Sequence, residues 1–272
     1  NTDPAFSSLI GQTFETGTSI TSVLSNILNP YTKTTVSRPG LFGTKDQVGF
    51  SYTSNTNVEV GTTVEINQIS YTISDPDKVK DDSVSLIRNG TSAESSLADS
   101  ASNTVSLPTV ITSQKIIPGT DSYKMSLTDN GNPNNIEYSI ESSTISINWM
   151  YRVRLAAHST EVSDDATASA MFLDTVDSSL INDPGSSRFD LVCSDNNSLD
   201  GKYTYIAIPE AFGTLSSVLA NNATDVTADF SLVTSGTLTV QNTNGLSVAY
   251  YIYRTNDTGA FNDGITLNVK LN

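Results

Sequence analysis

The feature of the sequence that most constrains the fold is an alternation of apolar and polar residues with a period of two. Along 145–155, Ile, Trp, Tyr, Val and Leu occupy every second position, with Ser, Asn, Met and Arg between them. The segment 265–271 alternates as strictly, with Ile, Leu or Val followed each time by Thr, Asn or Lys. Because successive side chains of a strand point to opposite faces, both patterns predict strands that bury one face.

Turn residues separate such segments along the chain. The run Asp-Asn-Gly-Asn-Pro-Asn-Asn at 129–135 predicts the tip of a hairpin, and Asp-Pro-Asp at 75–77 predicts a turn. Only 16% of the residues are charged, and Ser, Thr and Asn supply the polarity, which favours strands and turns over exposed helices. The sequence therefore predicts an all-β fold with two β-sandwich lobes, either Ig-like or jelly-roll-like.

One N-terminal segment departs from the period of two and predicts a short amphipathic helix over about 18–29. Thr18 can serve as its N-cap, and Pro30 ends it, because the residue before a proline is pushed out of the helical region. Its apolar residues share one helix face: Ile20, Val23, Leu24, Ile27 and Leu28. A helix of this length is marginal alone, so we expect this stripe to dock on the chain's own sheet or on a neighbouring subunit. The five residues are the candidate assembly contact.

These patterns predict a division of the chain into four parts. Residues 1–46 form an N-terminal docking segment that contains the helix, and 47–160 form the first β-sandwich lobe. The polar stretch 161–187 is expected to be a linker, and 188–272 the C-terminal β lobe. The one tryptophan, Trp149, lies in the middle of a predicted strand, so we expect it to anchor the core of the first lobe.

The charge of the chain argues against polyanionic partners. Its formal net charge is −15 and its pI is about 4.2, and its 14 basic residues are scattered. Nucleic-acid binding requires clustered Lys and Arg that displace counterions, and anionic membranes attract the same clusters. We therefore expect no nucleic-acid partner, and the lack of any long apolar run predicts no membrane insertion.

Few residues suit catalysis or metal binding. The chain has one His, His158, and one Cys, Cys193, whereas a structural zinc site takes about four such ligands. The acidic loops at 75–82 and 195–200 are more simply turns, and whether they bind calcium stays open. The motifs of hydrolase nucleophiles and of phosphate-binding loops are missing. We expect no catalytic residues, no cofactor and no metal site, and therefore no enzyme.

Several segments resemble structural proteins of tailed bacteriophages, above all tail, baseplate, neck and fibre-associated components. The similar segments lie at 17–31, 58–64, 201–213, 249–254 and 265–271. Their order is similar to virion proteins in which a docking helix precedes Ig-like modules and a terminal β-domain. The resemblance implies a virion protein, made in the host cytoplasm, that contacts other virion proteins and copies of itself as a trimer or hexamer. A capsid decoration protein is an alternative.

Two further functions remain open. The C-terminal lobe could bind a host surface glycan if its tyrosines are exposed as stacking platforms: Tyr203, Tyr205, Tyr250, Tyr251 and Tyr253. The competing interpretation, which the strand pattern favours, places these tyrosines in the core and the sheets. Alternatively, two of the 29 acidic residues could hydrolyse a glycoside, although the sequence indicates no particular pair.

Overall fold

The computed structural model describes residues 31–45, 48–131, 136–173, 177–181, 188–193, 201–262 and 264–272. The fold is mostly β, which confirms the predicted all-β class. The helices among the described residues are α3 (Asp165–Leu173) and the 3-10 turns η1 (Pro76–Lys78), η2 (Glu210–Phe212) and η3 (Thr227–Asp229). The helix predicted at 18–29 lies outside the described residues.

The chain folds into two compact units, each assembled from separate segments. Unit 1 contains the described residues of Asn1–Leu41, Asn67–Pro108 and Ser122–Ile145. Unit 2 contains the described residues of Phe42–Ile66, Thr109–Asp121 and Ser146–Asn272. The chain passes between units inside strands: β1 (Gly40–Lys45), β4 (Thr63–Thr72), β7 (Ser102–Gln114), β8 (Gly119–Asp129) and β10 (Ile145–His158).

The units group residues by contact, whereas the predicted lobes were consecutive stretches of chain. The predicted boundaries at 47–160 and 188–272 therefore stay a prediction. The stretch 161–187, expected to be a linker, holds helix α3 and strand β11 (Asp177–Ile181).

In unit 1, antiparallel strands flank β8. It pairs with β5 (Ser85–Arg88) on one side and with β9 (Tyr138–Glu141) on the other, and β5 pairs in turn with β6 (Thr91–Glu94). Asp129 of β8 lies opposite Tyr138 of β9, so the strands that flank 129–135 form the predicted hairpin. The core includes fully buried side chains at alternate positions of β8: Tyr123, Met125 and Leu127.

The chain before β1 is held on unit 1 by the buried carboxylate of Asp129. The backbone N–H of Thr34 donates to its Oδ2 at 2.7 Å, and the Tyr31 hydroxyl donates to its Oδ1. The N–H of Gly131 donates to the same Oδ1 at 3.1 Å. Burial, followed by the neighbouring Asp129 carboxylate, raises the pKa of the Tyr31 hydroxyl well above its ordinary value. Hydrogen bonds to an ionised acceptor are stronger than neutral ones, so this one side chain fastens the segment 31–34.

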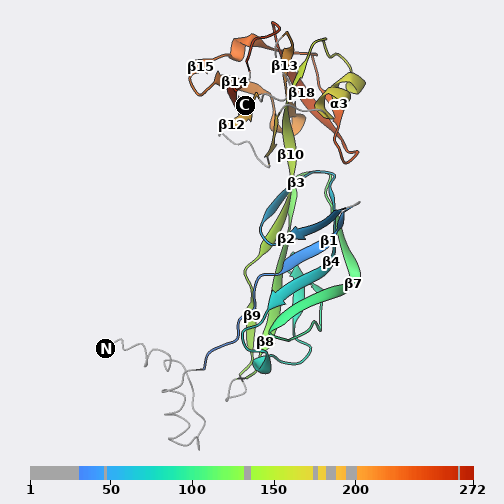
Figure 1. Ribbon diagram of the computed structural model, residues 1–272, viewed down its shortest axis with the longest axis vertical. Helices are drawn as coiled ribbons and strands as arrows, with labels where there is room; N and C mark the ends of the chain where they lie inside the picture. The colour runs from blue at the N-terminus through green and yellow to red at the C-terminus, as the bar shows by residue number, and fades with distance from the viewer. Residues whose placement is uncertain are drawn as a thin grey trace, which may run out of the picture. The chain divides into compact units, whose positions relative to one another are not determined.

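Besides β2 (Val48–Tyr52) and parts of β1, β4, β7 and β8, unit 2 contains two groups of strands (Figure 1). Around β10 lie β3 (Thr56–Glu59), which pairs in parallel, and β11 and β13 (Tyr203–Pro209), which pair antiparallel. Next to β13 comes β18 (Ser247–Thr255), which pairs with β16 (Phe230–Leu232) and β17 (Leu238–Gln241). The other sheet has the order β12 (Phe189–Val192), β19 (Thr266–Leu271), β14 (Leu215–Ala220) and β15 (Thr224–Asp225).

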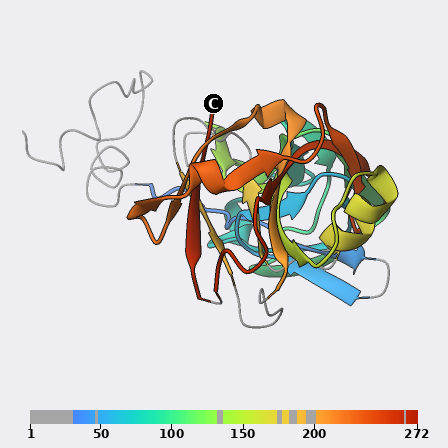
Figure 2. The same ribbon diagram turned by 90° about the horizontal axis from the view of Figure 1, so that it is seen from above.

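Both faces of the β10–β13–β18 group in unit 2 are covered. On one face, side chains such as Leu155 and Ile206 join Leu267 and Val269 of the other sheet in a single core. On the opposite face, Phe172 of α3 packs among apolar side chains of β13, β17 and β18. Helix α3, drawn in yellow, lies beside the orange-red strand β17 (Figure 1 and Figure 2). The central strands are therefore apolar on both sides.

Strand β10 confirms the alternation on which the fold prediction rested. Ile145, Ile147 and Trp149 are fully buried, whereas the residues between them are partly exposed. The indole Nε1–H of Trp149 donates to the carbonyl of Thr62 at 2.8 Å, which satisfies the polar group of the largest core side chain.

Apolar and polar residues also alternate over 58–66, but this stretch does not form one strand, because a turn at Val60–Gly61 separates β3 from β4. Gly61 has φ +85°, a left-handed conformation that suits glycine. A Cβ at this position would lie 2.8 Å from the Cβ of Leu246, so the turn also needs the space.

Candidate functional site

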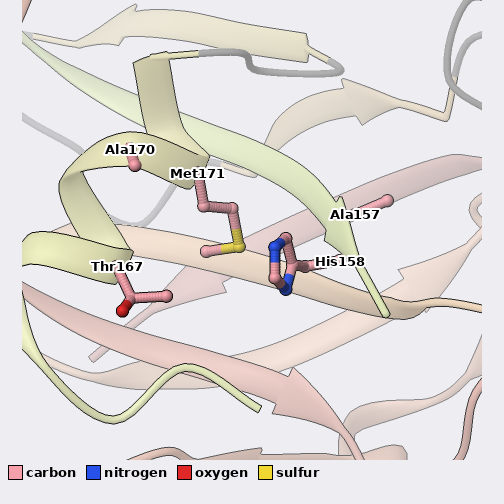
Figure 3. Close-up of a pocket in the computed structure, with 5 residues that line it drawn as sticks. All are labelled: Ala157, His158, Thr167, Ala170 and Met171. Carbon is pink, nitrogen blue, oxygen red and sulfur yellow. The ribbon is translucent and has the colours of Figure 1, made fainter. Parts of the chain in front are cut away.

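A pocket of about 280 Å³ opens in unit 2 where the end of β10 meets α3. Its lining comes from the last two residues of β10 and from one face of the helix: Ala157, His158, Thr167, Ala170 and Met171. Figure 3 shows the imidazole of His158 and the thioether of Met171 facing one another, with Thr167 at the side of the pocket. The helix residues share a face because positions three and four apart are neighbours on a helix.

Local hydrogen bonds start helix α3 next to the pocket. Asp164 caps it, since Oδ1 accepts the N–H of Thr167 and Oδ2 accepts its hydroxyl, both at 2.9 Å. These bonds from Thr167 lower the pKa of the Asp164 carboxyl. In addition, Asp165 and Ser169 of α3 accept the N–H groups of Thr239 and Gln241 at 2.9 and 3.0 Å, so the helix closes the outer edge of β17.

The two ring nitrogens of His158 differ in their contacts: Nδ1 lies within hydrogen-bond distance of Thr160, whereas Nε2 forms no hydrogen bond with Thr160. Its Nδ1 lies 2.9 Å from both the carbonyl oxygen and the hydroxyl of Thr160, so the tautomer decides which atom donates. Among the described residues, no partner bonds its Nε2. A half-buried imidazole with one open nitrogen can donate to or accept from a small polar ligand.

Tyr203 extends the site onto the neighbouring strand. It lies directly opposite His158 in the pairing of β10 with β13, so both side chains point to the same face of the sheet. The guanidinium of Arg254 lies over the Tyr203 ring, 4.4 Å from its centroid, and Nη1 of Arg254 pairs with Glu161 Oε1 at 2.6 Å. The site therefore combines an imidazole, a half-buried phenol ring and an ion pair.

The burial of two tyrosines removes them from the predicted set of glycan-stacking residues. Tyr205 is fully buried, and its hydroxyl donates to the carbonyl of Thr160 at 3.0 Å. Tyr250 is 1% exposed, and its hydroxyl donates to the carbonyl of Arg152 at 2.9 Å. Both rings are core residues under α3, because their strand positions face the covered side of the sheet.

The remaining tyrosines do not form one platform. Tyr251 and Tyr253 lie opposite Ile208 and Ile206 of β13, on the face away from Tyr203. Both are half-buried, Tyr253 packs against the core between the two sheets, and its hydroxyl accepts the N–H of Leu215 at 3.1 Å. Of the predicted set, only Tyr203 adjoins the pocket.

A buried ion cluster in unit 2 was missed by the sequence analysis. Glu59 of β3 accepts a bond from Arg152 Nε at 3.0 Å and one from Arg154 Nη2 at 2.6 Å. Glu59 is 6% exposed and Arg154 is 3% exposed. Arg154 Nη1 also donates to the Phe172 carbonyl at 3.0 Å, and Arg152 Nη1 donates to Ser178 Oγ at 2.6 Å. The cluster joins β3, β10, β11 and α3 inside the unit.

The period-two pattern could not reveal this cluster. It placed the two arginines on the polar side of β10, where solvent was the expected neighbour. Instead, α3 packs on that side, and Glu59 and Ser178 reach the arginines from the paired strands β3 and β11. The available signal was the occurrence of two arginines at alternate positions of an otherwise poorly charged strand. Buried guanidinium groups need a carboxylate partner, and Glu59 supplies it from a strand far away in the sequence.

The described residues hold no group of three or more His, Cys, Asp and Glu that could bind a metal ion. The acidic loop at 75–82 forms the turn η1, where Asp75 pairs with Lys78 at 2.6 Å. The loop at 195–200 lies outside the described residues, as do the candidate assembly residues Ile20, Val23, Leu24, Ile27 and Leu28. The Cys193 side chain is fully buried.

No helix in the described part of the chain is long and apolar enough to cross a membrane. No known protein-family model matches the chain, and no curated protein sequence is significantly similar to it.

Proposed function

We propose that this chain is a structural component of a bacteriophage particle, in a tail, baseplate, neck or fibre position, where it assembles with copies of itself. The observation that carries the proposal concerns two of the segments that resemble phage structural proteins. Segments 201–213 and 249–254 are distant in the sequence, yet they form strands β13 and β18, which pair with each other at the centre of unit 2. Another of these segments, 265–271, contains β19 of the second sheet. Three of the five similar segments thus supply strands to the core of unit 2.

In this proposal the two units are β-sandwich modules of the Ig-like or jelly-roll-like kind. The shared core of the two sheets in unit 2 supports this interpretation, because inward-facing side chains from two sheets interdigitate in a sandwich. The predicted N-terminal helix would dock through its stripe from Ile20 to Leu28 on a neighbouring subunit. The chain then has no catalytic role, and its high negative charge keeps it soluble before assembly.

The test is to ask whether the chain is part of a particle. Particles purified from the cells that produce it are analysed by mass spectrometry and by electron microscopy with an antibody to the chain. We expect stoichiometric amounts of the chain and label at the tail, baseplate, neck or fibre, whereas label over the whole capsid would indicate the decoration protein. A chain that is absent from every particle and is a stable monomer in light scattering would refute the proposal.

A second candidate function is the binding of a host glycan at the His158 pocket. The pocket volume of about 280 Å³ is near the lower end of small-molecule sites, at about 300 Å³, so one sugar unit is the largest ligand it would enclose. Tyr203 offers a half-buried ring beside His158, and His158 Nε2 offers a polar contact. A glycan array with the full chain, followed by Tyr203→Ala and by Tyr251→Ala on the opposite face, tests this. Binding that is lost only with Tyr203→Ala supports the candidate, and an array without hits removes it.

A further inference from the structure

Strand β7 ends the order of its sheet, β2-β1-β4-β7, in the part of the chain that the structure describes; β2 is Val48–Tyr52. β7 has 13 residues and none of them is charged. An edge strand presents backbone N–H and C=O groups, and natural proteins guard long edges with lysines, prolines or bulges. In β7 the one residue that hinders pairing with another strand is Pro108. Residues 109–114, which follow it, include no proline and no charged residue. This stretch, which belongs to unit 2, is therefore a poorly guarded edge.

The same stretch exposes large apolar side chains. Val110 is 48% exposed, and Ile116 and Ile117, in the turn after β7, are 64% and 63% exposed. They are three of the seven large hydrophobic side chains that are exposed among the described residues, and they fall within eight consecutive positions. Clustered apolar exposure marks an interaction surface, whereas scattered apolar residues do not. We call 109–117 the β7 edge.

Charge decides which partner suits the β7 edge. Its one charged residue is Lys115, whose Nζ pairs with the buried carboxylate of Asp121 at 2.9 Å. The surface is therefore neutral, whereas the whole chain carries −15. A basic partner would bind more favourably to the acidic parts of the surface than to this neutral strand, because the chain carries a net charge of −15. Two copies of this chain, in contrast, repel each other except where both surfaces lack charge. A second copy is thus the occupant that this neutral, apolar strand fits.

We propose that the β7 edge binds the β7 edge of a second copy as an antiparallel strand pair related by a twofold axis. This inference rests on the proposed homo-oligomeric function and adds the contact to it. An edge strand that adds to its own copy satisfies the backbone groups of both strands at once. The outward-facing positions Val110, Thr112 and Gln114 lie at the pair, and Ile116 and Ile117 pack beside it.

A twofold contact restricts the assembly. An isologous interface generates dimers and the assemblies that contain twofold axes, whereas a simple ring of three uses head-to-tail contacts. The β7 edge is therefore compatible with a hexamer built from three dimers. It is not the contact of a plain trimer.

The first experiment breaks the pair with like charges. The full chain and its Val110→Lys and Ile117→Lys variants are compared by light scattering over a dilution series, with Leu232→Lys as the control. Leu232 is also an exposed apolar residue, at 37%, but it lies on β16. We expect each β7-edge variant to weaken self-association about a hundredfold or more, since like charges across an interface strongly oppose it. Leu232→Lys should leave association unchanged, and Trp149 fluorescence should show that all variants are folded.

The second experiment locates the axis with single cysteines. Because Cys193 is fully buried, an introduced surface cysteine is the accessible thiol of the described residues. Val110→Cys, Thr112→Cys and Gln114→Cys are oxidised mildly, with Ser92→Cys on the edge strand β6 as the matched control. A disulfide needs Cα atoms within about 7 Å, so the position nearest the axis should give the most dimer. Ser92→Cys should give none above background.

The outcomes separate the contact from the function. Loss of association in the lysine variants together with cross-linking on β7 supports the β7 edge. A chain that associates equally in all variants overturns the β7 edge and leaves the particle proposal standing, because that proposal is tested on particles. A wild-type chain that stays monomeric over the dilution series overturns it too. If the thiol of the Val110→Cys variant then resists a maleimide, another part of the same chain covers β7.

Discussion

The buried charge of Glu59 is the most informative single group to remove. Glu59→Gln keeps the size and one acceptor oxygen of the side chain but deletes the charge that two guanidinium groups share, at 2.6 Å from Arg154 and 3.0 Å from Arg152. Arg154 is 3% exposed, so water cannot replace the lost partner. Its Nε already lacks a hydrogen-bond partner in the described structure, so little compensation is at hand.

The expected cost follows from this geometry. Removing one partner of a buried ion pair destabilises a protein by about 3–5 kcal/mol, because an uncompensated charge stays in the interior. Gln should fall near the low end, at about 3 kcal/mol, and Glu59→Ala near the high end, since Ala also leaves a gap. With a urea slope of about 3 kcal/mol/M, the midpoint should fall by about 1 M or more.

The assay is equilibrium urea unfolding followed by tryptophan fluorescence. The single tryptophan, Trp149, lies opposite Val58 in the same β3–β10 pair that carries Glu59, so its emission reports on unit 2. The matched control is Glu161→Gln, which removes the ion pair between Glu161 and Arg254. The Glu161 side chain is 68% exposed. Exposed pairs contribute about 0–1 kcal/mol, so this midpoint should hardly move.

The comparison of the two variants decides whether burial is the cause. If Glu59→Gln and Glu161→Gln shift the midpoint equally, the argument from desolvation is refuted. A double variant, Glu59→Gln with Arg154→Met, adds a second check. Because the pair is lost as a unit, the two losses should not add, and a coupling of about 0.5–3 kcal/mol is expected.

Three further predictions concern other parts of the fold. Gly61→Ala should destabilise by at least about 1–2 kcal/mol in urea unfolding, because φ +85° is strained for alanine and the new Cβ would lie 2.8 Å from Leu246; Gly90→Ala, at φ +82° with open space around it, should cost less, and equal costs would refute the role of the contact. Asp129→Ala should cost about 2–5 kcal/mol and speed hydrogen exchange in the chain before β1, because it removes a buried charged acceptor; unchanged exchange there would contradict the anchoring role. Burial raises the pKa of the Tyr250 hydroxyl from 10.0 to about 12, so the unfolded chain loses this proton first and stability should fall as the pH rises from 10.0 towards 12. In urea unfolding, the midpoint of Tyr250→Phe should fall less steeply over this pH range than that of the wild type. An equally steep fall would argue against Tyr250 as the group responsible.

Local patterns predicted the features that depend on neighbours in the sequence. The period of two in 145–155 predicted β10 and its buried face, since side-chain direction in a strand follows from position alone. The turn residues of 129–135 likewise predicted the hairpin of β8 and β9, because turn chemistry is local. The low charge of the chain and its many Thr, Ser and Asn residues already favoured strands over helices.

Which side of a strand is covered, and by what, depended on elements that come together only in the folded chain. Arg154 lies on the side of β10 that the pattern left to solvent, and it is buried because Glu59 of β3 pairs with it and α3 packs against it. The pocket at His158 exists for the same reason, since α3 packs over the end of β10.

The sequence by itself determined that this chain is a β protein, where several of its strands and turns lie, and that its net charge is strongly negative. Those properties follow from residue order and charge, which every conformation shares. The tertiary structure decided the pairing of Glu59 with two distant arginines, the burial of Tyr205 and the neutral β7 edge. These depend on contacts between remote segments, which a periodic pattern does not encode.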